Sequence, residues 1–236
     1  MTIKANGSAI PTDTTSDKVL IKAAENSKSK SSPQWTPLRD NPTVTLISGK
    51  IITIPADPDR IPPKQSAELK CRIDEHRYPI YLFGLTGSGK TSAAAVAARC
   101  FPEKSSGYYI ETDRVTGVEK QVRVYFDADQ SFMADAKFLC NCIAMRENVS
   151  AIFNRVQKAS LFVLDDVGTR GMTAAGTEAM LDILNARGDL PMIVTGNHAP
   201  RLLAKEIGDE RVASRLLAGG ATCWIEFPKQ DQRIRA

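Results

Sequence analysis

The stretch GLTGSGKT at residues 84–91 decides the fold that this sequence predicts. It satisfies the pattern G-x-x-x-x-G-K-[ST], follows the apolar run IYLF at residues 80–83, and opens the alanine-rich segment KTSAAAVAARC at residues 90–100. A strand, a glycine loop and a helix in that order are the context that a phosphate-binding loop requires. The glycines let successive backbone N–H groups curl around phosphate oxygens, and the helix presents its positive end to them.

The loop predicts a nucleotide site with ATP and Mg²⁺ as its cofactors. Lys90 can reach the β- and γ-phosphates, and the hydroxyl of Thr91 can be a magnesium ligand. A glycine-rich turn that binds nothing is the alternative, and the placement between a strand and a helix argues against it. The predicted binding residues are Gly84, Thr86, Gly87, Ser88, Gly89, Lys90 and Thr91.

A second element, LFVLDD at residues 161–166, consists of four apolar residues followed by two acids. Such a buried strand delivers its carboxylates to the C-terminal edge of a parallel sheet, where ligands of open α/β sheets bind. We expect Asp165 to hold magnesium, through water, and Asp166 to orient and deprotonate the attacking water. The pattern is weak by itself, but the chain between it and the loop has room for an intervening strand and helix.

Two further segments carry candidate catalytic residues. Asn197 ends the apolar run MIVTGN at residues 192–197, where it can hydrogen-bond the attacking water or the γ-phosphate; the alternative is an asparagine that only caps the strand. Arg211 and Arg215 in GDERVASRL are four residues apart and so share one helical face. They could neutralise charge at the ATP of a neighbouring subunit, or they could belong to a solvated basic helix.

Apolar strands alternate with helices along the chain, which predicts an α/β fold with a parallel sheet covered on both faces. We expect a disordered or partner-docking tail over residues 1–40, because its composition offers almost no apolar surface. A hairpin and a helix follow over residues 41–77, and the ATPase domain occupies residues 78–236. Within that domain we expect strands at 107–112, 118–126, 191–195 and 221–227, and helices at 129–158 with a break near Asn148, 173–187, 200–207 and 211–217.

Composition sets outer limits on the function. Of the 236 residues, 42% are hydrophobic and 25% charged, which is ordinary for a globular protein, and no run is long enough to span a membrane. The first residues have no continuous apolar segment of the kind found in secretory signals. Five cysteines without zinc-ligand spacing suggest thiols in a reducing cytoplasm. A net charge of +4 permits nucleic-acid binding without requiring it.

Taken in order, GLTGSGKT, LFVLDDVG, MIVTGN and GDERVASRL followed by GGATCWIEF resemble the DnaC/IstB branch of the AAA+ ATPases, which is related to the initiator DnaA. The resemblance covers about residues 78–236. It implies a P-loop NTPase sheet of order 5-1-4-3-2, Asn197 as sensor 1, Arg215 as the arginine finger, and Arg211 as the second basic residue of that box. It also implies that no C-terminal lid domain follows. The segment around residues 113–117 looks like an insertion, and the tail before residue 40 matches no loader domain.

The resemblance implies an ATP-dependent helicase loader in DNA replication, acting as a head-to-tail ring or spiral on single-stranded DNA and a replicative helicase. Loaders of this size are common in phages and mobile elements, which suggests such an origin. The alternative is an IstB-like helper ATPase that works with a transposase. A small-molecule kinase is disfavoured by the paired acids and the arginine box, and a phage packaging ATPase by the lack of a nuclease feature. Candidate DNA contacts are Thr169, Arg170 and Thr173, unless these form an ordinary polar loop.

Overall fold

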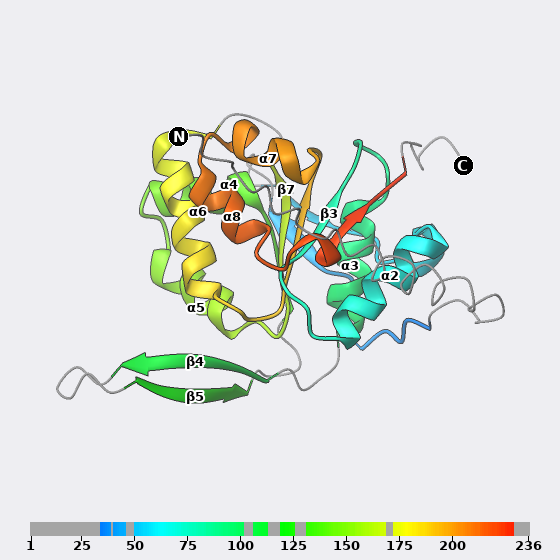
Figure 1. The fold of residues 1–236 in the computed structure, drawn as a ribbon, viewed down its shortest axis with the longest axis horizontal. Coiled ribbons are helices and arrows are strands. Elements are labelled where there is room, and N and C mark those ends of the chain that lie inside the picture. The colour runs from blue at the N-terminus through cyan, green and yellow to red at the C-terminus, as the bar shows by residue number, and fades with distance from the viewer. Residues whose placement is uncertain are drawn as a thin grey trace, which may run out of the picture. The chain divides into compact units, whose positions relative to one another are not determined.

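The computed structural model describes residues 34–38, 40–45, 50–101, 131–168 and 172–228, together with the backbone of residues 106–112 and 119–125. Its centre is a five-stranded parallel sheet (Figure 1). The strand order is β6 (Phe132–Asp135), β7 (Phe162–Val167), β8 (Met192–Gly196), β3 (Ile80–Phe83) and β9 (Trp224–Glu226). Counted from the strand that precedes the glycine loop, this is the predicted order 5-1-4-3-2, which is confirmed. Among the described residues, no helix follows β9.

Helices cover both faces of this sheet, as the alternation of strands and helices predicts. The helices α2 (Pro63–Asp74) and α3 (Lys90–Cys100) pack on one face. The other face is covered by α4 (Ala136–Ala144), α5 (Val149–Lys158), α6 (Ala174–Arg187), α7 (Pro200–Ile207) and α8 (Glu210–Leu216). Two short 3-10 turns, η1 (Pro58–Arg60) and η2 (Ala221–Cys223), complete the regular structure of the described core.

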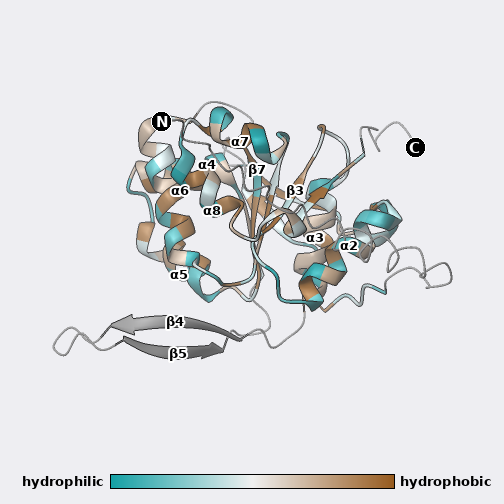
Figure 2. Ribbon diagram, in the orientation of Figure 1, coloured by the Kyte–Doolittle hydropathy of each residue, from teal (hydrophilic) through white to brown (hydrophobic). Residues whose placement is uncertain are grey.

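Strand residues alternate between the two cores because successive side chains of a strand point to opposite faces. In β7, Phe162 and Leu164 pack into the core that includes α4 and α6, whereas Val163 packs against α3. All three are fully buried, which explains why the segment reads as one continuous apolar run (Figure 2).

Two hairpins lie outside the central sheet. The strands β1 (Thr43–Thr45) and β2 (Ile51–Thr53) pair antiparallel with Val44 opposite Ile52, as expected for the leading segment. The strands β4 (Ser106–Thr112) and β5 (Glu119–Tyr125) form a separate antiparallel pair, which agrees with an insertion between the loop helix and the rest of the core. The turn at residues 113–118 lies outside the described residues.

Two elements differ from the sequence-based expectation. Residues 221–223, expected to begin the last strand, form the 3-10 turn η2, and the strand itself begins at Trp224. Residues 129–158 were expected to be helical, but Phe132–Asp135 form β6, the strand at the far edge of the sheet, and the helix begins at Ala136. The error arises because this strand has only four residues and its last residue, Asp135, is already the N-cap of α4, so no turn separates the two patterns. The predicted break is confirmed at Asn148, which has a left-handed backbone and precedes α5.

A buried arginine fastens the N-terminal edge of the sheet. Arg187, at the end of α6, is 1% exposed, and its guanidinium donates to the carbonyls of Val156 and Ala159 at 2.8 Å each and to the carbonyl of Pro191. Burial lowers the pKa of Arg187 to about 9. The guanidinium thereby joins the end of α5, the end of α6 and the segment that enters β8.

Near the start of the described residues, Trp35 donates its indole N–H to the hydroxyl of Ser66 on α2 at 2.8 Å. The remainder of the predicted tail, residues 1–33, lies outside the described residues. None of the helices in the described part of the chain has the length and apolar character needed to cross a membrane.

Candidate functional site

The glycine loop has the backbone conformation that its sequence predicts. Gly84, Gly87 and Gly89 have positive φ angles of 143°, 82° and 97°, a region that residues with a side chain seldom adopt. Gly84 is also required by close packing, since a Cβ atom there would lie 2.8 Å from the carbonyl oxygen of Phe227. Gly89 directly precedes the first residue of α3, so the N–H groups of the first helical turn face the loop.

The ammonium group of Lys90 is held by the loop itself. Its Nζ donates to the carbonyl oxygens of Gly84 and Leu85 at 2.8 Å each and approaches the Ser88 hydroxyl at 3.4 Å. Lys90 is only 6% exposed, and burial lowers the pKa of its ammonium while Asp166 and Asp165 raise it. No carboxylate of the described residues lies within ion-pair distance of Lys90, so its buried charge has only neutral partners. An anion bound in the loop would supply the missing countercharge.

The predicted magnesium ligands lie next to each other. The Thr91 hydroxyl donates to Asp165 at 3.0 Å and 3.3 Å from the two carboxylate oxygens, which joins the start of α3 to the end of β7. On its other side, the Asp165 carboxylate accepts a bond of 2.5 Å from the hydroxyl of Thr195 on β8. A hydroxyl and a carboxylate beside a phosphate-binding loop fit Mg²⁺, which is usually held by one or two carboxylates together with phosphate oxygens.

Asp165 is almost completely removed from water. Burial raises its pKa to about 6, against the opposing effect of the bonds from Thr195 and Thr91, and the nearby charges of Asp166 and Asp135 raise it further. Asp135 lies opposite Asp165 in the register of β6 and β7. Its own pKa is also raised by burial, and its carboxylate caps α4 by accepting the N–H of Phe138 at 2.7 Å. Three acids therefore meet at the C-terminal edge of the sheet.

Asp166 differs from Asp165 in conformation and exposure. It has a left-handed backbone with φ of 65°, and its side chain is exposed whereas Asp165 is buried. The register between β7 and β8 shifts at this point, from Leu164 opposite Val194 to Val167 opposite Gly196. This irregularity turns the two adjacent acids in different directions, one toward the helix α3 and one toward solvent, as their different predicted roles require.

Asn197 follows β8 directly and is partly buried. Next to it, the His198 carbonyl accepts a hydrogen bond of 2.8 Å from the hydroxyl of Tyr81 on β3. Gly196 leaves the space for this contact, because a Cβ atom there would lie 2.5 Å from the Tyr81 hydroxyl oxygen. The segment that carries Asn197 is thus fastened to the strand that carries the loop.

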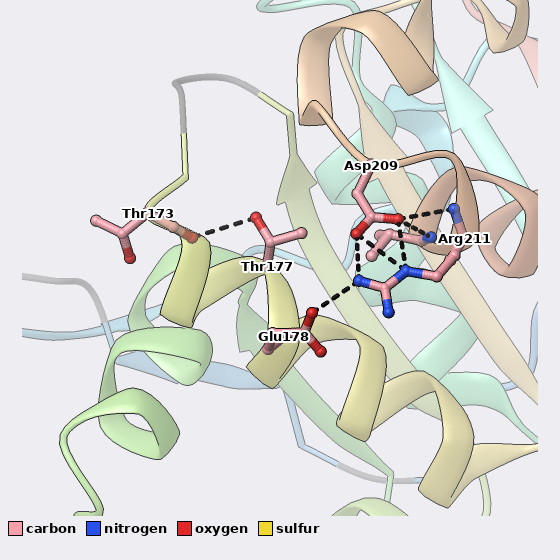
Figure 3. A network of polar contacts seen from close by, with 6 residues as sticks. Thr173, Thr177, Glu178, Asp209 and Arg211 are labelled. Atoms are coloured by element: carbon pink, nitrogen blue, oxygen red, sulfur yellow. Dashed lines mark hydrogen bonds and ion pairs between the residues drawn. The ribbon is translucent and has the colours of Figure 1, made fainter.

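The two arginines of α8 have different surroundings, although both are exposed. Figure 3 shows Arg211 held within its own chain: its guanidinium bonds Asp209 at 2.7 Å and 3.2 Å and Glu178 of α6 at 2.7 Å. The guanidinium of Arg215, one turn later, makes no hydrogen bond or ion pair with any described residue, whereas its backbone carbonyl accepts the N–H of Ala218 at 3.2 Å. The structure therefore separates two arginines that the sequence presents as a pair.

Of the candidate DNA contacts, Thr169 and Arg170 lie outside the described residues. Thr173 is the N-cap of α6, where its hydroxyl accepts the N–H of Gly176 at 3.1 Å and its carbonyl accepts the hydroxyl of Thr177 at 3.2 Å (Figure 3).

The structure brings Lys90, Thr91, Asp165 and Asp166 together at one edge of the sheet, with Asn197 directly after the neighbouring strand β8. Sequence reasoning missed two residues of this cluster, Asp135 and Thr195. Asp135 was missed because the strand that contains it was expected to be helical. Thr195 lies inside an apolar run, and only its position two residues before Asn197 could have drawn attention to it.

No protein-family model and no curated protein matches the sequence. Among solved structures, AMPPCP-bound DnaA from Aquifex aeolicus matches with a TM-score of 0.50 and 16% identity over 72% of this chain. A DnaC helicase loader and DnaI match over 70% of this chain, with TM-scores of 0.49 and 0.47 and identities of 17% and 19%; the match covers 89% and 84% of those chains. This chain spans 47% of the length of DnaA. The resemblance predicted from the motifs is confirmed at the level of the fold.

The burial of Asp165 makes a prediction about pH and stability. Its pKa of about 6 in the folded chain exceeds the ordinary aspartate pKa of 3.8, so the native state holds the proton more tightly than the unfolded state. The contribution of Asp165 to the free energy of unfolding is therefore fully present below about pH 4 and falls as the pH rises through 6. At pH 8 it is lower by about 3 kcal/mol. In EDTA, Asp165→Asn should be more stable than the parent protein at pH 8, by up to that amount, and similar to it at pH 4.

Urea unfolding at the two pH values measures this difference. Asp182→Asn is the matched control, because Asp182 is an exposed acid on α6 and its replacement should leave the pH dependence unchanged. An Asp165→Asn protein that is less stable than the parent at pH 8 would show that the buried carboxylate does not destabilise the folded state.

Proposed function

We propose that this chain is an ATP-hydrolysing helicase loader that acts in DNA replication. The observation that carries the ATPase part is the buried ammonium of Lys90, which lies within a glycine loop at the start of α3 and has only neutral partners. The γ-phosphate of ATP is an anion of the right chemistry for this position, and the helix N-terminus adds N–H donors for the other phosphate oxygens. The loop residues Gly84, Thr86, Gly87, Ser88 and Gly89 form the cradle.

Asp165 and Asp166 have different roles in this proposal. Thr91 and Asp165 would hold Mg²⁺, which when bound draws charge from the phosphate oxygens. Asp166 extends into solvent, where it can accept a proton from water as the water oxygen bonds to the γ-phosphorus and the bond to the β,γ-bridging oxygen breaks. Asn197, directly after the neighbouring strand β8, can orient the water or the γ-phosphate. The products are ADP and inorganic phosphate, with the proton on Asp166.

The roles of Lys90 and Asp166 can be separated by substitution. Lys90→Ala should lose ATP binding, because the countercharge in the loop is gone. Asp166→Asn should bind ATP as the parent protein does yet hydrolyse it about a hundredfold more slowly, the usual scale for a positioned base. A fluorescent ATP analogue measures binding, and phosphate release measures turnover. If Lys90→Ala hydrolysed ATP at the rate of the parent protein, the assignment of the site would be wrong.

The different surroundings of the two α8 arginines support a role for Arg215 in trans. Arg211 is held by Asp209 and Glu178 of its own chain, whereas Arg215 is exposed and makes no ion pair with the described residues. An arginine offered to the γ-phosphate of the next protomer would generate a head-to-tail ring or spiral. In better-studied GTPases such a finger contributes roughly 10³ to 10⁵ in rate.

Mixing two inactive variants tests this assignment. Arg215→Ala should bind ATP normally and be almost inactive, while Lys90→Ala offers Arg215 but no competent loop. A mixture should regain part of the parental rate, because some interfaces then combine an intact loop with an intact Arg215. Arg201→Ala is the control, since it removes an exposed arginine of α7. Full activity of Arg215→Ala as a monomer would assign Arg215 to a solvated helix.

The loader part of the proposal rests on the order of the motifs and on the fold shared with DnaA. We expect single-stranded DNA to raise the ATPase rate, and high salt to abolish this effect, since phosphate contacts are sensitive to salt. The tagged chain in ATP should retain a hexameric helicase from bacterial cell extract. Retention of a transposase instead would favour the IstB-like alternative, and rates unaffected by DNA would contradict both.

A further inference from the structure

Thr195 connects both acids of the site through a single hydroxyl group. The residue lies in β8 and is 1% exposed. Its Oγ1 donates to the carboxylate of Asp165 at 2.5 Å and accepts the backbone N–H of Asp166 at 2.9 Å. One buried atom therefore holds the side chain of the first acid and the main chain of the second.

The pairing of β7 with β8 explains why a hydroxyl is needed there. Leu164 is opposite Val194 and Val167 is opposite Gly196, so two residues of β7 face the single residue Thr195. Such a bulge interrupts the ladder of backbone bonds. The N–H of Asp166 is turned out of this ladder, and the Thr195 hydroxyl accepts it in place of a strand carbonyl.

The same contact supports an unfavourable backbone conformation. Asp166 has φ of 65°, a left-handed geometry that is strained for a residue with a Cβ atom. Such geometry persists only where the surroundings hold it in place. The bond from its N–H to Thr195 is one such restraint, and it fixes the direction in which the Asp166 carboxylate leaves the strand.

We propose that Thr195 is a positioning residue for ATP hydrolysis, acting through Asp166 and Asp165 rather than on the substrate. This inference rests on the proposed ATPase activity. Thr91 also donates to Asp165, but its hydroxyl is a candidate magnesium ligand. When Thr91 binds the metal, Thr195 is the hydroxyl that still donates to Asp165. Loss of the hydroxyl would remove the bond from the Asp166 N–H to Thr195 and with it one restraint on the bulge. A misplacement of the base by about 1 Å can cost on the order of 100-fold in rate.

Thr195→Val tests the proposal, because valine keeps the shape and removes both hydrogen bonds. We expect kcat to fall by about 10- to 100-fold while the affinity for a fluorescent ATP analogue stays within about twofold of the parent. Thr195→Ser keeps the hydroxyl and should restore most of the rate. Thr53→Val, which changes an exposed strand threonine of β2, is the control and should retain the parental rate.

A double variant shows whether Thr195 acts through Asp166. If it does, adding Thr195→Val to Asp166→Asn should slow hydrolysis by no more than about twofold beyond Asp166→Asn alone. Multiplication of the two effects would overturn the proposal, as would a Thr195→Val protein that turns over ATP at the parental rate. Equal loss in the valine and serine variants would also overturn it, since only packing would then matter. Absence of hydrolysis in the parent protein would instead contradict the proposed function.

Discussion

The central strand β3 is hydrogen-bonded to β8 on one side and to β9 on the other, and the position of each group in the site follows from this pairing. Because all five strands run parallel, their carboxyl ends meet at one edge. The glycine loop leaves β3 at that edge, next to the strand β8, which contains Thr195 and is followed by Asn197. On the other side, the Phe227 N–H donates to the Phe83 carbonyl at 2.7 Å, and the close approach of Phe227 to Gly84 leaves no room for a side chain.

The groups gathered at this edge are individually unfavourable in the ligand-free chain. Lys90 is buried with only neutral hydrogen-bond acceptors, the Asp165 carboxylate is removed from water, and Asp166 has a left-handed backbone. Each of these costs would be reduced or put to use by a phosphate group and a divalent cation. Native structures concentrate such costs at functional sites, and this edge follows that rule.

The sequence predicts the parts of the fold that depend on local patterns. The loop and the helix boundaries at Asn148 and Thr173 follow from glycine placement, apolar runs and capping residues. The strand order was implied only by the resemblance to a known family. The edge strand β6 was missed because Asp135 ends the strand and caps the helix at once. The bulge opposite Thr195 could not be predicted either, because it is a property of two strands paired across the sheet, and neither strand's own sequence reveals the register. The roles of the site residues remain predictions.

Arg187 has a consequence for how the molecule opens. Its guanidinium bridges the carbonyls at the end of α5 and at the entry to β8, while its own backbone closes α6. Local unfolding of any one of these three segments exposes a buried cation and leaves carbonyls of the other two without a donor. The ends of these three segments therefore unfold as one cooperative unit, at the edge of the sheet opposite the glycine loop. Lysine could not replace Arg187, because a single ammonium lacks the planar fork that reaches several carbonyls in different directions.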